Sequence, residues 1–326
     1  MAFANTSVSD IIATTIQSRT RKIADNVTDN NAILKRLKMK GKQKPFSGGY
    51  QIMQELSFAE NSNAGWYSGY DILPTGISDV ISAATYNIKQ CAVPVVISGL
   101  EMLQNAGKER MIDLMESRLS VAESTMANLI SQGLYSSGTA NGGKQIDGLG
   151  AALPIDPTAA PYGGIDGNTW AFWRNQVSNQ TAANGLNSTL IGGYWNALWA
   201  SCLRGSDSVD LIMCDNTVWA AYVASLQANQ RYTTPEVGEL GFASLKFMGA
   251  DVVVDGGIGG QCPAGTAFFL NTDYIHYRPH SARNMVPLSP NRRYATNQDA
   301  EVQILAWAGN LTTSGRQFQG RYDANG

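Results

Sequence analysis

Residues 108–133 read KERMIDLMESRLSVAESTMANLISQG, and the spacing of their apolar side chains predicts one very long amphipathic helix. Residues 108–132 would span roughly 40 Å at ~1.5 Å per residue, enough to cross a whole domain. Gly133 is the expected stop. The expected buried stripe consists of Met111, Leu114, Met115, Leu119, Ala122, Met126, Leu129 and Ile130, and the charged residues expected to face away are Glu109, Asp113, Glu116, Arg118 and Glu123.

The segment ahead of this helix carries a capping-box pattern. Ser98 is followed three residues later by Glu101, which predicts a first helical turn or two, and Gly107 interrupts before the long helix.

Further upstream, the periodicity changes from helical to alternating. YQIMQELSF (50–58) and AATYNIKQCA (83–92) each place apolar residues on one parity, which predicts two half-buried strands. The predicted inward residues are Tyr50, Ile52, Leu56 and Phe58 in the first strand, and Ala84, Tyr86, Ile88 and Ala92 in the second.

Between these strands lies ENSNAGWYSGYDILPTG (60–76), rich in Gly, Asn and Ser but carrying Trp66, Tyr67 and Tyr70. The simplest structure is a long two-stranded finger with an aromatic tip. An isolated hairpin is only marginally stable in water, so we expect the finger to lie on another molecule. The alternative is that these aromatics fold back under their own loop. If they are exposed, they mark a contact with a protein partner.

The N-terminal 44 residues form a basic arm on an acidic body. They hold nine Lys/Arg against three acids, a net charge of +6, whereas the rest of the chain holds 15 against 23, a net charge of −8. The charge asymmetry indicates that the arm meets an anionic partner; the alternatives are a solvated tail or pairing with acidic patches on a neighbouring copy. Its later cations are Lys35, Arg36, Lys38, Lys40, Lys42 and Lys44.

The arm also has apolar periodicity. Val8, Ile11, Ile12, Thr15 and Ile16 fall near helical spacing, and a second short helix is expected over residues 31–37. Phosphate contact needs no apolar face, so we expect Ile11, Ile12 and Ile16 to dock on a neighbouring subunit.

The C-terminal half predicts a mixed α+β lobe without regular βαβ spacing or internal repeats. Helices are expected near residues 190–203 and 217–227, the second directly after the apolar strand DLIMCD (210–215). Further strands are expected in LKFMGADVVVDGG (245–257), TAFFLNTDYIHYR (266–278) and AEVQILAWAG (300–309).

Composition narrows the class of protein. The 326 residues are 44% hydrophobic and 15% charged, typical of a soluble globular chain, and no apolar run approaches the ~18 residues of a membrane span. The N-terminus does not resemble a secretory signal, so we expect folding in a cytoplasm. Four scattered cysteines, Cys91, Cys202, Cys214 and Cys262, favour buried reduced thiols over disulfides or a zinc site.

No catalytic or cofactor motif is recognisable. His276 and His280 are separated by Pro279 and do not share a helical face, and no HExxH, GxSxG, GxGxxG or phosphate-loop pattern occurs. We therefore expect no enzyme activity, no cofactor and no metal.

The order of these parts resembles the major capsid protein of tailed bacteriophages with the Hong Kong 97 fold. The residues that carry the resemblance are SGLEMLQN (98–105), LISQGLYSSGT (129–139) with IDGLG (146–150), LKFMGADVVVDGG with AGTAFFLNTDYIHYRP (264–279), and GRQFQGRYD (315–323). The resemblance implies an α+β fold with five parts: a basic N-terminal arm at 1–45, an extended loop at 46–90, a peripheral domain with its spine helix at 91–165, an axial domain at 166–265, and return strands of the peripheral domain at 266–326.

The implied function is self-assembly, as hexamers and pentamers, into an icosahedral head shell around double-stranded DNA. Such a shell would form in the bacterial host cytoplasm with a portal and, in some cases, a decoration protein. Only about 45 residues precede the extended loop, so we expect a separately encoded scaffolding protein rather than a cleaved N-terminal segment. Some relatives join subunits by an isopeptide bond from a lysine in that loop, but residues 45–88 contain no lysine, so no such bond is expected.

Two alternatives remain at this point. The first is an encapsulin-like bacterial compartment shell of similar fold that encloses an enzyme cargo. The second is a cytoplasmic enzyme or an adhesin-like α+β protein, which the lack of a recognisable site disfavours.

Overall fold

The computed structural model describes residues 32–98, 100–101, 114–227, 244–256, 260–288, 293–294 and 300–326. The expected helix containing Ile11, Ile12 and Ile16, the position of Met111 and the interruption at Gly107 therefore lie outside the described residues.

The described elements follow the predicted order closely. The longer helices are α2 (Ala32–Met39), α4 (Leu114–Leu134), α8 (Ile191–Ser201) and α9 (Asn216–Gln227). The shorter ones are α5 (Ala140–Gly143), α6 (Leu149–Ala152), α7 (Ala182–Gly185) and the 3-10 turns η1 (Ala171–Trp173), η2 (Thr272–Tyr274) and η3 (Arg316–Phe318). The strands are β1 (Gln51–Ser57), β2 (Ile81–Asn87), β3 (Lys89–Ser98), β4 (Gln176–Asn179), β5 (Leu211–Cys214), β6 (Ser244–Phe247), β7 (Ala250–Val254), β8 (Thr266–Leu270), β9 (Ile275–Pro279), β10 (Val286–Pro287), β11 (Arg293–Tyr294), β12 (Ala300–Thr313) and β13 (Gly320–Asp323).

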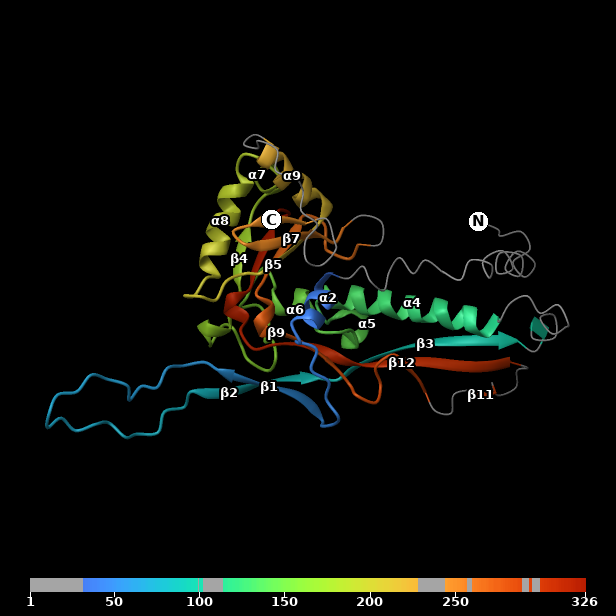
Figure 1. Ribbon diagram of the computed structural model, residues 1–326, viewed down its shortest axis with the longest axis horizontal. Coiled ribbons are helices and arrows are strands. Elements are labelled where there is room, and N and C mark those ends of the chain that lie inside the picture. The colour runs from blue at the N-terminus through green and yellow to red at the C-terminus, as the bar shows by residue number, and fades with distance from the viewer. Residues whose placement is uncertain are drawn as a thin grey trace.

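A five-stranded sheet lies beside the long helix α4 and is organised around β12. Strand β3 pairs antiparallel with β12 from Ser98↔Ala300 to Lys89↔Gly309, and β9, β10 and β11 also pair with β12. Helix α4 runs along one face of this sheet (Figure 1). The segment that precedes α4 has the predicted capping box, because the Ser98 and Glu101 backbone amides each donate to the other residue's side chain.

A six-stranded sheet forms the second lobe, in the order β4-β13-β8-β5-β7-β6. Every residue of β5 and β8 is buried, which explains why these strands are continuously apolar rather than alternating. One face packs against α8 and α9 around Trp195, which stacks on Tyr222 at 4.6 Å between ring centroids. The opposite face packs against the C-terminal end of α4, and the Tyr135 hydroxyl donates to Asp255 across this junction.

The expected boundary at residue 265 does not separate the two sheets. Strand β8 pairs with β5 and β13, and β13 pairs with both β8 and β4, so both lie in the six-stranded sheet. Assigning all of 266–326 to the return into the other sheet is wrong for these two strands. The chain leaves the six-stranded sheet after β8, passes along β9 to β12 in the five-stranded sheet, and returns through β13.

Three positions of the first lobe also differ from expectation. Tyr50 is 93% exposed, because β1 begins one residue later at Gln51. The predicted strand 83–92 is divided at Ile88 between β2 and β3, and this break reverses the parity, so Ala92 faces outward while Val95 is buried. Leu129 is 43% exposed, since it lies at the edge of the buried arc of Ala122, Met126 and Ile130.

The predicted helix end at Gly133 is one residue from the observed end of α4 at Leu134. Glycine is needed at this position because another side chain packs closely against it. A Cβ at Gly133 would lie 2.9 Å from the Ile146 side chain. Gly148, in the IDGLG segment, comes even closer, since its Cβ would meet the carbonyl oxygens of Gly133 and Leu134. The α4 end and the following turn therefore need glycine for close backbone approach.

Candidate interaction surfaces

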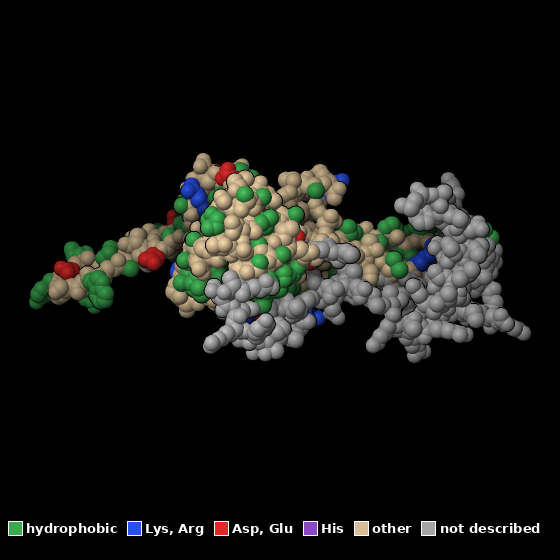
Figure 2. Space-filling model, turned by 90° about the horizontal axis from the view of Figure 1, so that it is seen from above, with side chains coloured by type: hydrophobic (Ala, Val, Ile, Leu, Met, Phe, Trp, Pro, Cys, Tyr) green, Lys and Arg blue, Asp and Glu red, His purple; other side chains and the backbone are tan. Residues whose placement is uncertain are grey.

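The finger, residues 51–87, extends away from the body of the molecule. Strands β1 and β2 pair antiparallel from Gln51↔Asn87 to Ser57↔Ile81. Beyond them the two sides stay together through Phe58 and Val80, and through the Ser62–Ser78 side-chain hydrogen bond. Figure 2 shows the finger projecting from the body with hydrophobic side chains gathered at its end.

The fingertip, residues 66–73, exposes the aromatics that the sequence placed there. Trp66 and Tyr70 are fully exposed and Tyr67 is 68% exposed, with Ile72 and Leu73 also open to solvent. The alternative in which these aromatics fold back under their own loop is wrong for this structure. A contiguous exposed apolar patch is typical of a protein-contact site, and nothing within the described chain covers this one.

A second apolar patch lies on the face of the five-stranded sheet that points away from α4. Directly paired residues share a face, so Val96↔Val302 and Pro94↔Ile304 lie side by side. Strand β10 also pairs with β12, and its Val286 lies opposite Ala306 on this face. We call Ala92, Pro94, Val96, Val286, Val302 and Ile304 the outer sheet face. The sequence pattern did not indicate this face, because the predicted parity placed Ala92 on the buried side.

The base of the arm is fixed to the body by apolar packing. Helix α2 inserts Ile33 and Leu37, both fully buried, into the core shared with Met126 and Ile130 of α4. The predicted helix at 31–37 is thus confirmed.

Charge pairs add to this attachment. Arg36 lies 3.2 Å from Asp210 and 3.5 Å from Asp251, Lys40 lies 3.0 Å from Asp210, and Lys42 lies 3.4 Å from Asp273. We call these cations and their three aspartates the arm clamp.

The clamp keeps its central carboxylate, that of Asp210, ionised. Burial alone would raise the pKa of Asp210, but hydrogen bonds from the Thr272 backbone and hydroxyl, and from Lys40, hold that pKa below its usual range. Arg36, Lys40 and Lys42 are therefore paired with acidic residues of their own chain. Lys38 and Lys44 are exposed, and Lys35 is half-buried.

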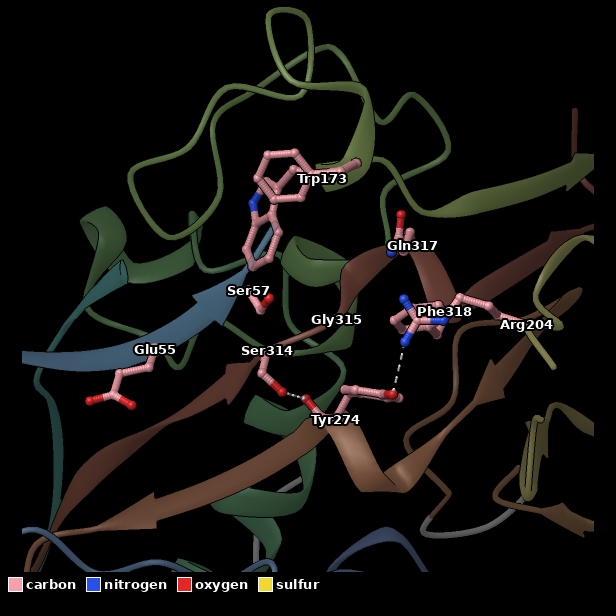
Figure 3. A pocket seen from close by; sticks show the side chains of 10 residues that line it. Glu55, Ser57, Trp173, Arg204, Tyr274, Ser314, Gly315, Gln317 and Phe318 are labelled. Atoms are coloured by element: carbon pink, nitrogen blue, oxygen red, sulfur yellow. Dashed lines mark hydrogen bonds between the residues drawn. The ribbon is translucent and has the colours of Figure 1, made fainter. Parts of the chain in front are cut away.

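A cavity of about 300 Å³ lies where the base of the finger meets the six-stranded lobe (Figure 3). Its walls include Phe172, Trp173, Tyr274 and Phe318, and Arg204 lies 4.2 Å above the Phe318 ring. The lining offers serine hydroxyls but no histidine, so the cavity assembles no nucleophile with a neighbouring imidazole base.

The four cysteine thiols are free. Burial raises the pKa of Cys202 and of Cys262 to about 12, and that of Cys91 to about 11, so these thiols stay protonated and unreactive at neutral pH.

Metal-binding and membrane-spanning features are both absent from the part of the chain that the structure describes. No cluster of three His, Cys, Asp or Glu residues there could hold a metal ion. None of the described helices has the length and apolarity needed to cross a membrane.

Comparison with known proteins gives matches at the level of structure. No family model and no curated protein matches the chain. The "Cyanophage A-1(L) capsid asymmetric unit" matches with a TM-score of 0.71 at 16% sequence identity, covering 94% of this chain and 96% of that chain. This chain has the Hong Kong 97-like capsid fold. The capsid of the native GTA particle matches this capsid fold with a TM-score of 0.63 at 10% identity over 87% of this chain and 89% of that one.

The match also holds for a second cyanophage. The capsid of P-SCSP1u has a TM-score of 0.56 at 11% identity and covers 86% of this chain and 85% of that chain. Identity is low and coverage is high in all three matches, so what they share with this chain is the architecture.

Proposed function

We propose that this chain is the major capsid protein of a tailed bacteriophage, and that it self-assembles into the icosahedral head shell enclosing double-stranded DNA. The observation that carries the proposal is the structural match to the cyanophage capsid over 94% of this chain and 96% of that one. The extended loop, spine helix and axial lobe of the resemblance would correspond to the finger, α4 and the six-stranded lobe.

The two apolar patches support self-association. The fingertip and the outer sheet face are different surfaces of one chain, so a contact between them is heterologous and generates rings when the rotation closes. We propose that the fingertip of one copy, through Trp66, Tyr67 and Tyr70, lies on the outer sheet face of its neighbour. Repeated contacts of this kind would build hexamers and pentamers.

The arm has two roles in this proposal. Arg36, Lys40 and Lys42 fasten its base to the body, which leaves the exposed Lys38 and Lys44 to contact packaged DNA without reading its sequence. Replacing Lys38 and Lys44 with Gln should leave empty shells forming and lower the salt dependence of DNA retention. Loss of shell formation in this variant would refute the division of roles.

The remaining partners follow from the shell. A portal and a separately encoded scaffolding protein would act during assembly in the host cytoplasm, and the mature protein would reside in the virion. We assign the chain no catalytic role and no cofactor.

Electron microscopy of native particles, with analysis of their contents, tests the function. We expect closed shells that protect double-stranded DNA from nuclease. Shells of the same fold filled with a protein cargo and no DNA would support the encapsulin-like alternative instead. Purified chain that forms no closed particle would contradict both.

A further inference from the structure

Helix α4 has an exposed face that is unusual for a helix in contact with water. Val121, Thr125, Asn128, Leu129 and Gln132 lie on this face, which we call the α4 stripe. Val121 is 60% exposed and Leu129 is 43% exposed, and they are two turns apart on one side of the helix. The adjacent arc of Ala122, Met126 and Ile130 is buried, and Leu129 lies at the boundary between this arc and the stripe.

The chemistry of the stripe indicates a protein segment as its occupant. None of its five side chains is charged, whereas a solvent-exposed helix face ordinarily carries charged residues. The Thr125 hydroxyl already donates to the Val121 carbonyl at 2.8 Å, so covering Thr125 leaves its own donor satisfied. Arg118 lies one turn before Val121 on the same side, but it pairs with Glu101 at 2.7 Å, so its charge is already neutralised within the chain. The five stripe residues themselves offer no cation to a DNA phosphate.

The chain itself contains a matching segment ahead of α2. In residues 8–16, VSDIIATTI, the side chains of Val8, Ile11, Ile12, Thr15 and Ile16 fall on one side at helical spacing. The polar residues Ser9, Asp10 and Thr14 fall on the other. Such a segment has one apolar face to bury, and the stripe has two exposed aliphatic side chains to cover.

The connection is long enough for the two to meet within one molecule. Helix α2 begins at Ala32 and packs in the same core as the C-terminal half of α4 (Figure 1). Residues 17–31 can span up to about 50 Å when extended. The whole of α4 is only about 30 Å long at ~1.5 Å per residue. A tethered segment also docks at a high effective concentration, which favours its own helix over that of another copy.

We infer that residues 8–16 dock on the α4 stripe of the same chain, with Ile11, Ile12 and Ile16 against Val121 and Leu129. This differs from the sequence-based expectation of a neighbouring subunit, because the tether favours the nearer α4. The arm is then attached at two points, by its apolar segment along α4 and by the clamp at α2. This inference does not depend on the proposed shell function, since it concerns the single subunit.

Engineered disulfides in the full-length chain test this placement. Ile12→Cys is combined in turn with Val121→Cys, Thr125→Cys and Leu129→Cys, in a background where the half-buried Cys91 is replaced by Ala. The matched control pairs Ile12→Cys with Ala197→Cys, which is exposed on helix α8 of the other lobe. Dilute protein is oxidised, and disulfides are identified by non-reducing gel and peptide mass.

We expect at least one α4 pair to close within a single chain, giving a faster-migrating monomer, at least about tenfold faster than the Ala197 control. Disulfide-linked dimers would place the segment on a neighbouring copy and overturn the inference. Equal rates for α4 and control pairs, or no disulfide with any α4 position, would also overturn it and would point to a helix of another protein as the occupant.

A second measurement does not depend on cysteine geometry. Hydrogen exchange of residues 8–16 is compared between the natural chain and the variant Val121→Asp/Leu129→Asp, with Ala197→Asp as the control. We expect exchange in this segment to rise about tenfold in the α4 variant only, because opening frees its amides. Unchanged exchange would contradict docking on the stripe.

Discussion

Arg36 Nε lies 3.2 Å from Asp210 Oδ2, although 174 positions separate the two residues in the chain. Arg36 belongs to α2 at the base of the arm, and Asp210 immediately precedes β5 in the six-stranded lobe. Lys40 reaches the same carboxylate at 3.0 Å. This one aspartate therefore joins the N-terminal arm to a lobe that is distant from it in sequence.

Asp210→Asn should weaken that attachment, because Arg36 and Lys40 would lose the charge that they share. The side chain of Asp210 is 18% exposed. We therefore expect a loss of about 2 kcal/mol in the free energy of unfolding, between the values of exposed and buried pairs. Urea unfolding of the unassembled subunit measures it. Asp273→Asn is the control, and its loss should be at most about 1 kcal/mol because Asp273 is 58% exposed.

The clamp also predicts a direction of pH dependence. The folded pKa of Asp210 lies below its unfolded value, so its contribution to stability is present at neutral pH and is lost as pH falls below about 4. The Asp210→Asn variant should lack this part of the acid destabilisation. An acid profile identical to that of the natural chain would contradict the clamp.

His276 predicts a separate pH effect at milder acidity. Burial, reinforced by Lys44, Lys42 and Arg278, lowers the pKa of His276 to about 4. The unfolded chain therefore binds this proton first, so stability should fall as pH decreases from about 6.5 to 4 and not change further from this group. His276→Gln should flatten the stability profile in that window, as measured by urea midpoints at successive pH values. An unchanged slope would show that this imidazole titrates normally.

Gly148→Ala should be strongly destabilising, because the added methyl would collide with the carbonyl oxygens of Gly133 and Leu134 at the end of α4. Backbone must move to relieve the clash, and we expect a loss of about 3 kcal/mol. Gly193→Ala is the control, since Gly193 lies in α8 with open space around it. There, alanine should be neutral or stabilising by up to about 1 kcal/mol. Thermal unfolding of both variants checks the difference.

Local pattern predicted the local elements of this fold. The apolar spacing of residues 114–130 predicted the long helix, and Ser98 with Glu101 predicted its capped approach. Trp66 and Tyr70 were predicted at a fingertip because aromatic residues stood in a loop rich in Gly, Asn and Ser. These signals act over a few residues, so the sequence displays them directly.

Long-range pairing was not predictable in the same way. The placement of β8 and β13 in the six-stranded sheet depends on partners more than 40 residues apart, and the Arg36–Asp210 pair is still more distant. The outer sheet face was missed because the break at Ile88 reverses which residues face the core. A one-residue change of parity exchanges the two faces of a strand, and nothing local marks it.

The finger cannot supply the lysine of an isopeptide cross-link, because residues 45–88 contain no lysine. Shells that are boiled and reduced should therefore migrate as a single band near 35.0 kDa on a denaturing gel. A ladder of multiples would refute this prediction.

The fingertip should matter for assembly and not for folding. Trp66→Ser/Tyr70→Ser removes two fully exposed side chains, so the melting temperature of the subunit should stay unchanged while shell formation is lost. Met248→Ser, an exposed apolar position on the turn between β6 and β7, should assemble normally. Normal shells from the fingertip variant would refute its role as a contact.

Sedimentation velocity of the purified natural chain under assembly conditions measures whether this chain builds closed shells. We expect a fast-sedimenting population of closed particles in equilibrium with few or no free subunits. A single slow species of about 35 kDa under every condition tried would contradict it.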